Sequence, residues 1–103
     1  MAEMVEQQLS INICYIPVEV VAEVVYVLSK IYNVERKILA QTVIAIIDTD
    51  KISVAHRHVV RHALGVFASS TFSFVDCLLI GYAEKDEYSV FTFDKKLRNY
   101  LNK

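Results

Sequence analysis

Two stretches in the last third of the sequence decide the fold: residues 72–80, FSFVDCLLI, and residues 90–97, VFTFDKKL. The first begins with a helix-start signal and continues as an apolar run, which indicates a helix. The β-branched and aromatic residues of the second indicate a strand that leads into a charged helix start. Each stretch holds one carboxylate, Asp76 or Asp94, at a junction between elements. A carboxylate there either caps a helix or belongs to a functional site.

The rest of the chain alternates in the same way between short β-prone runs and longer helical segments. Pro17 suits the first turn of a helix, and a largely buried helix is expected after it despite the many valines, because a strand of that length would be unusual. Strands separated by helical crossovers predict a short parallel sheet flanked by helices, an α/β fold in a single domain over residues 1–103. The expected order is a polar helix over residues 2–9, strand 11–16, helices 18–32 and 34–47 (the latter capped by Asn33), a turn at 48–51, strand 52–54, helices 56–69 and 74–85, strand 89–93 and helix 95–102.

The composition is unusually apolar for so short a chain. Hydrophobic residues make up 54% of the 103 residues, against about 45–50% in ordinary soluble domains. We therefore expect part of the apolar surface to be buried in a homo-oligomer. No run reaches the roughly 18 apolar residues of a membrane span, and the acidic N-terminus lacks a secretory core, so a cytoplasmic protein is expected. The net charge of −1 excludes a strongly basic protein that coats nucleic acid.

The two cysteines carry no metal or redox motif. Cys14 and Cys77 lie far apart in the sequence and form no C-x-x-C pair. We expect two buried, reduced thiols.

Three acids are candidates for chemistry, and each also has a structural explanation. Glu23 lies in a valine-rich helix, where a carboxylate needs a partner or a metal, unless it shares one solvated stripe with Glu19. Asp76 fits a capping box with Ser73, and Asp94 can cap the last helix. Asp94 also follows a predicted strand, at the edge where open parallel sheets bind ligands. Three acids converging there would repel one another unless a hard cation such as Mg²⁺ or Mn²⁺ lay between them.

Basic residues are gathered in two places. His58 and His62 are four residues apart on one predicted helix, a legitimate metal spacing, but Arg57 and Arg61 are interleaved with them. A solvated, weakly basic helix face, which could also touch a polyanion, is the favoured interpretation. Three further cations that follow Asp94 could contact phosphates: Lys95, Lys96 and Arg98.

Taken together, three segments resemble the PIN-domain nucleases. Residues 16–28, IPVEVVAEVVYVL, resemble the helix that carries the second acid of that family, residues 72–80 its third-acid segment, and residues 90–97 its closing strand and fourth acid. The similarity extends over about residues 11–102, and the closest subgroup is the VapC-type toxins of toxin–antitoxin pairs.

The resemblance implies metal-dependent cleavage of RNA, with Mg²⁺ or Mn²⁺ as cofactor. Carried over by position, Glu23, Asp76 and Asp94 would be the catalytic, metal-binding acids, and Thr92 would be a polar helper. The implied partners are RNA, an antitoxin protein and a second copy of the chain, in a dimer that could exchange elements.

The resemblance is incomplete at its start. PIN domains begin with a strand that carries the first acid and lies centrally in the sheet, and this sequence has no matching segment. We therefore expect an N-terminally truncated, impaired ribonuclease. The alternative is a non-catalytic PIN-like interaction module that binds an antitoxin or a full-length paralogue. A weaker option is a nucleic-acid binder that uses Arg57, Arg61 and the adjacent histidines.

Overall fold

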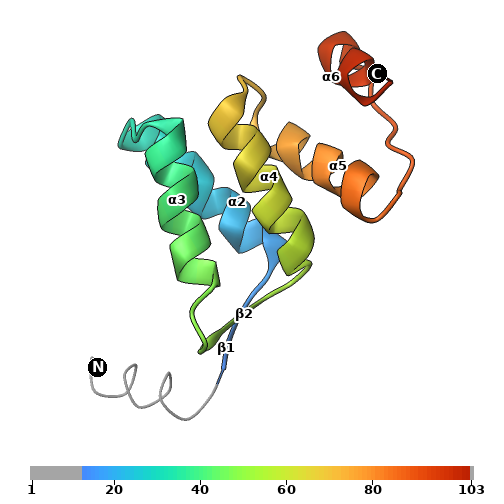
Figure 1. The fold of residues 1–103 in the computed structure, drawn as a ribbon. Coiled ribbons are helices and arrows are strands. Elements are labelled where there is room, and N and C mark those ends of the chain that lie inside the picture. The colour runs from blue at the N-terminus through green and yellow to red at the C-terminus, as the bar shows by residue number, and fades with distance from the viewer. Residues whose placement is uncertain (1–12, 103) are drawn as a thin grey trace.

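The computed structural model describes residues 13–102, which form an α/β domain (Figure 1). The predicted helix over residues 2–9 and the first part of the predicted strand 11–16 lie outside the described residues. The elements are β1 (Cys14–Ile16), α2 (Val18–Tyr26), the π-helix η1 (Val27–Ile31), α3 (Arg36–Ile47), β2 (Ile52–Val54), α4 (Arg57–Ser69), α5 (Phe74–Lys85) and α6 (Lys95–Leu101).

The sheet of the described part is small and parallel. Cys14 of β1 pairs with Ile52 of β2, and Ile16 pairs with Val54. The predicted parallel pairing is confirmed, but the predicted third strand over residues 89–93 is wrong, since these residues have no regular secondary structure. Within residues 13–102 nothing pairs with them, and β-propensity alone does not hold a strand.

The helices form most of the domain. α4 packs between α3 and α5, and α2 crosses behind them (Figure 1). A Cβ added at Gly81 of α5 would lie 2.9 Å from the carbonyl oxygen of Val59 in α4. Only glycine permits this approach, so α4 and α5 are in unusually close contact.

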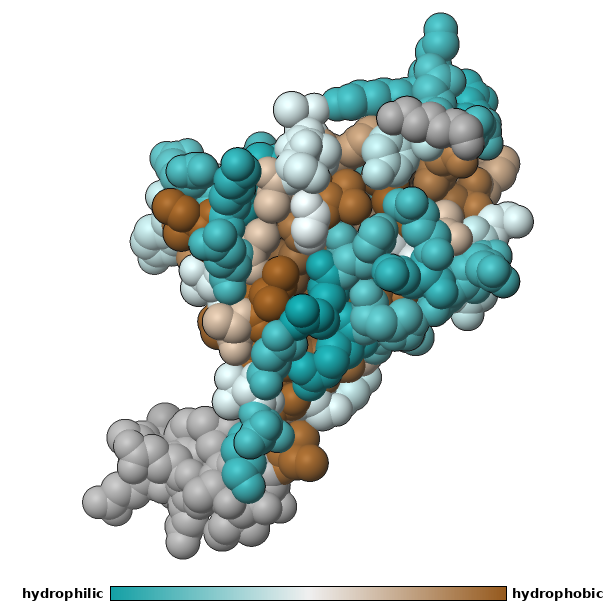
Figure 2. Space-filling view, viewed as in Figure 1, coloured by the Kyte–Doolittle hydropathy of each residue, from teal (hydrophilic) through white to brown (hydrophobic). Residues whose placement is uncertain are grey.

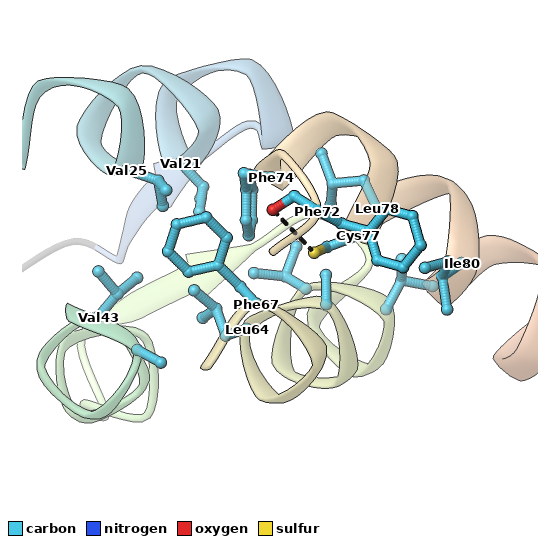
Figure 3. Close-up of a cluster of buried hydrophobic side chains, with 14 of the residues drawn as sticks. Val21, Val25, Val43, Leu64, Phe67, Phe72, Phe74, Cys77, Leu78 and Ile80 are labelled. Carbon is cyan, nitrogen blue, oxygen red and sulfur yellow. Dashed lines mark hydrogen bonds between the residues drawn. The ribbon is translucent and has the colours of Figure 1, made fainter. Parts of the chain in front are cut away.

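Buried apolar side chains from all these helices form one core (Figure 3). Val21 and Val25 of α2 point toward Phe67 of α4 and Phe74 of α5 (Figure 3). Phe67 and Phe74 meet edge to face, with their ring centroids 6.0 Å apart. α2 spans Val18–Tyr26, which confirms the prediction that this valine-rich segment is a helix and not a strand. The expectation that this helix is largely buried is wrong, because only Val21 and Val25 of α2 are buried.

Helix boundaries follow local signals, with one exception. α5 spans the predicted residues, and α4 begins one residue after His56. The predicted cap at Asn33 is wrong, because Glu35 is the N-cap residue of α3. Asn33 instead has φ 53° directly after η1. Asparagine tolerates this left-handed conformation and ends helices with it, so Asn33 terminates one helix and does not start the next.

Many large apolar side chains remain exposed. Phe93 is 86% exposed and Phe91 is 83% exposed, and their rings contact each other edge to face with centroids 5.0 Å apart. Val20 and Val24 on α2 are also exposed. No helix within residues 13–102 has the length and apolar character needed to span a membrane.

Candidate functional site

Glu23 is exposed on α2, as is Glu19 one turn earlier. Glu19 and Glu23 therefore share one solvent-exposed side of α2, which is the structural explanation given for Glu23 from the sequence. The residue beside Glu23, Ala22, together with Val25 and Tyr26, lines a cavity of about 260 Å³ that also reaches Val75, the neighbour of Asp76. The structure thus brings the acid-bearing part of α2 close to the first turn of α5.

Asp76 is half-buried in the first turn of α5. The Oγ of Ser73, the N-cap residue, accepts a hydrogen bond of 3.2 Å from the Asp76 backbone N–H, which confirms the predicted cap. Phe72, just before the cap, and Cys77 are both buried. The cap fixes the start of α5 and thereby the position from which the Asp76 carboxylate extends.

Asp94 is exposed and caps α6, with its carboxylate accepting a hydrogen bond of 2.9 Å from the Leu97 N–H. The prediction that it follows a sheet strand is wrong, because residues 89–93 form none. Thr92 has a local role: its Oγ1 accepts a hydrogen bond of 3.0 Å from the Asp94 N–H. Both side chains therefore organise the entry into α6.

The three acids suit a hard cation by chemistry but are not gathered around one point. Within residues 13–102 no group of three or more histidine, cysteine, aspartate or glutamate side chains could hold a metal ion. Glu23 lies on α2 and Asp76 on α5, and these two helices are in contact; α6, whose N-cap residue is Asp94, also contacts α5. In this arrangement the carboxylates do not form a metal centre, and no reaction step can be assigned to a metal from their geometry.

Lys96 approaches the cavity that separates α2 from α5, which we call the α2–α5 cavity. Its Nζ donates a hydrogen bond to the Oγ1 of Thr71, a residue of the cavity lining, and lies 4.6 Å from the centroid of the Phe72 ring. Lys95 and Arg98 are exposed on α6. Of the three predicted phosphate contacts, Lys96 therefore lies nearest to the cavity.

The basic residues of α4 line a separate groove of about 470 Å³, together with Lys85 of α5. Hydrophilic residues gather over this part of the molecule (Figure 2). His58 Nε2 lies 2.5 Å from Asp86 Oδ1, and His62 Nε2 lies 3.2 Å from Glu84 Oε1. Sequence reasoning missed these two acids, because only the packing of α5 on α4 brings them to the histidines.

The arginines of the same helix are tied to the turn after α3. Arg61 and Arg57 both bond to the carboxylate of Asp48, and Arg57 also donates to the carbonyl oxygen of Ile52. The hydrogen bond from Arg61 holds the pKa of the Asp48 carboxyl below its usual value. These cations thus have structural partners, in addition to facing the groove.

The two cysteines differ. Cys77 is fully buried, and burial raises the pKa of its thiol to about 11. Cys14 on β1 is exposed, so the prediction of two buried thiols is wrong for Cys14. Cys14 and its neighbour Tyr15 are both exposed, so the start of β1 is covered on neither face by the core.

These observations define an α/β domain with a small parallel sheet, closely packed helices and a cavity between α2 and the start of α5. The chain belongs to the PIN-domain family, because the PIN domain family model matches residues 2–102. PIN domains are a nuclease-type family, and its members generally use divalent metal ions. No curated protein and no solved structure gives a significant match.

Proposed function

We propose that this chain is a metal-dependent endoribonuclease of the VapC type, the toxin of a toxin–antitoxin pair, with Mg²⁺ or Mn²⁺ as cofactor. The observation that carries the proposal is the PIN match over residues 2–102. Glu23, Asp76 and Asp94 are the proposed catalytic and metal-binding acids. The neighbourhood of α2 and the first turn of α5 at the α2–α5 cavity supports a role for the first two.

The chain's own residues would orient the RNA and the acids. Capping hydrogen bonds hold the backbone positions of Asp76 and Asp94. Lys95, Lys96 and Arg98 on α6 carry positive charge next to Asp94 and would contact phosphates. The proposal requires the three acids to gather when a metal ion binds, because no group of three ligand side chains is preformed within residues 13–102.

We propose that the activity of this chain is weak. Within residues 13–102 no three carboxylate or other ligand side chains are gathered to hold a metal ion. Fewer gathered carboxylates hold a divalent cation less tightly, so a high Mn²⁺ concentration should be needed.

The test is cleavage of a single-stranded RNA with and without Mn²⁺, comparing Asp76→Asn and Asp94→Asn with Asp50→Asn. Asparagine caps helices about as well as aspartate, so Asp94→Asn should keep the cap of α6. Asp76→Asn leaves Ser73, the N-cap residue of α5, in place, so both site variants should stay folded while losing a ligand. Asp50 lies in the exposed turn before β2 and serves as the control. We expect cleavage by the control alone. Equal cleavage and equal Mn²⁺ binding by all three variants would refute the assignment.

A second candidate function is a non-catalytic interaction module. The exposed Phe91 and Phe93 and the exposed valines of α2 favour it, because isolated domains rarely leave so many large apolar side chains in water. The proposed partners are an antitoxin or a second copy of the chain. Light scattering should show a stable oligomer that Phe93→Glu weakens, with no metal-dependent cleavage of RNA. A monomer at all concentrations would contradict self-association.

A further inference from the structure

The α2–α5 cavity combines apolar walls with a polar rim. Val25, Phe67 and Phe74 form its apolar side, and all three are almost fully buried. Ser29 and Thr71 add hydroxyls at the lining. Ligand sites in proteins are typically lined in this way, by apolar side chains with a few polar groups that fix orientation.

The charged residues of the cavity are all positive. Lys30 and Arg36 line it, and no acidic side chain does. Arg36 is half-buried, donates Nε and Nη2 to the carbonyl oxygens of Phe67 and Phe72, and lies 3.6 Å above the centroid of the Phe67 ring. Among residues 13–102, no carboxylate pairs with Arg36 or Lys30. A half-buried guanidinium without a carboxylate favours an anion in the space beside it.

The carbonyl bonds of Arg36 explain only part of this arrangement. They tie the start of α3 to the end of α4, a structural role that leaves the Nη1 group without a hydrogen bond to the described residues. They also do not explain Lys30, which is exposed and has no structural partner there. The two cations on one apolar-walled cavity therefore call for a ligand with an anionic end.

The π-helix supports the same conclusion. The wide turns of η1 continue α2 and place Ser29 and Lys30 on the cavity beside Val25 and Tyr26. Segments of π-helix are rare and occur frequently at functional sites. Tyr26 is 58% exposed and lines the cavity, so its side chain is accessible to a ligand there.

We propose that the α2–α5 cavity binds one nucleotide of RNA, with its phosphate at Lys30 and Arg36 and its base against Tyr26 and the apolar wall. Aromatic side chains stack on bases, and phosphates bind lysine and arginine. The volume of about 260 Å³ holds one such unit. The choice of a nucleotide among aromatic anions rests on the proposed function. Lys96, which donates a hydrogen bond to Thr71, extends the positive charge beyond the cavity toward the next phosphate.

The test measures the affinity of adenosine monophosphate by calorimetry, in EDTA, for the chain and two lysine variants. Lys30→Glu should weaken binding about tenfold or more, the size expected for one charge-assisted contact. Lys37→Glu makes the same charge change at an exposed position of α3 that does not line the cavity, and it should bind like the unaltered chain. Tyr26→Ala should also weaken binding. Equal affinities in both lysine variants would overturn the proposal.

Three further ligands fix what the site recognises. Adenosine and inorganic phosphate should each bind more weakly than adenosine monophosphate, because each lacks one half of the ligand. Adenosine bound as tightly as the nucleotide would overturn the phosphate contact. N-acetylphenylalanine carries an aromatic ring and a carboxylate; if it bound through Lys30 while the nucleotide did not, the site would take a peptide and the proposal would be overturned.

This result is separable from that of the cleavage assay. Adenosine monophosphate contains no bond between nucleotides, and EDTA removes divalent ions, so binding does not require catalysis. Loss of cleavage with intact nucleotide binding would refute the nuclease alone. Intact cleavage without nucleotide binding would refute this site alone.

Discussion

The α4–α5 interface and the segment of residues 86–94 are both rich in apolar residues, but only the first is packed. At the interface, Val59 and Ile80 have no exposed surface, and Gly81 lets the helix backbones approach closely. In the segment, Phe91 and Phe93 are more than four-fifths exposed. Apolar residues therefore form part of the core at the α4–α5 interface, whereas in residues 86–94 they remain exposed to solvent.

The two regions differ in exposure because only the α4–α5 interface is covered by other elements of the domain. α4 is covered by α3 on one side and α5 on the other (Figure 1). In the segment, burial alternates from half-buried Val90 and Thr92 to exposed Phe91 and Phe93, which is the pattern of a strand face. Within the described residues no strand pairs with it. The segment thus has the side-chain alternation of a strand without the partner that would make it one.

The largest expected effect contrasts truncation in the two regions. Ile80→Ala should lower the free energy of unfolding by about 2–5 kcal/mol, because it leaves a cavity in a packed core. Phe93→Ala should change it by no more than about 0.5 kcal/mol, because the ring touches little of the folded domain. Urea denaturation followed by circular dichroism measures both. A cost of several kcal/mol for Phe93→Ala would show that this ring is buried in solution.

The two glycines give the next contrast. Gly81→Ala should destabilise the domain by about 1–3 kcal/mol, since the added methyl group meets the Val59 carbonyl oxygen and the helices must separate. Gly65, in the middle of α4, has nothing within 4 Å of an added Cβ. Gly65→Ala should therefore stabilise the helix by about 0.5–1 kcal/mol. Thermal unfolding of the pair checks both signs; a neutral Gly81→Ala would contradict the close approach.

Removing the N-cap of α5 and removing that of α6 should have different effects on stability, and this difference is smaller than the two above. Ser73→Ala should cost about 1 kcal/mol of global stability, because α5 belongs to the core. Asp94→Ala removes the cap of α6, which contacts the rest of the domain mainly through α5. It should lower the protection of α6 amides from hydrogen exchange and leave the global unfolding midpoint nearly unchanged. A common shift in both measurements would mean that α6 unfolds with the core.

Local sequence signals predicted the parts of the fold that local interactions decide. The capping signal of Ser73 and Asp76 places the start of α5, and Asp94 caps α6 as expected. The third strand could not be predicted correctly, because a strand depends on a partner that the segment's own residues do not specify. Asn33 has properties that suit a helix start and a helix end, and only the backbone conformation distinguishes the two.

For the candidate site, too, the sequence identified individual residues but not the way in which the fold arranges them. Sequence identified Glu23, Asp76 and Asp94 by resemblance, but it could not show that these acids do not form a group able to hold a metal ion within the described residues. It also missed the α2–α5 cavity, which is made by residues from five elements and the loop before α5. Arg36 could not be singled out from the sequence, because an arginine at the start of a helix is ordinary. Only the structure shows that no carboxylate among residues 13–102 pairs with it.

The last contrast concerns the two thiols, and its effect on stability vanishes at neutral pH, where both thiols are protonated in the folded and unfolded states. Iodoacetamide should alkylate exposed Cys14 in the folded protein, and Cys77 only after unfolding. The folded-state pKa of Cys77, about 11, lies above the ordinary thiol value of about 8.5. The folded state therefore binds more protons between these values, and stability should fall as the pH rises through this window. Cys77→Ala should make that decline shallower, although half-buried Tyr82, whose pKa is also raised by partial burial, contributes in both proteins. An identical alkaline decline would mean that Cys77 ionises as easily in the folded state as in the unfolded one, and hence that the start of α5 is open to water.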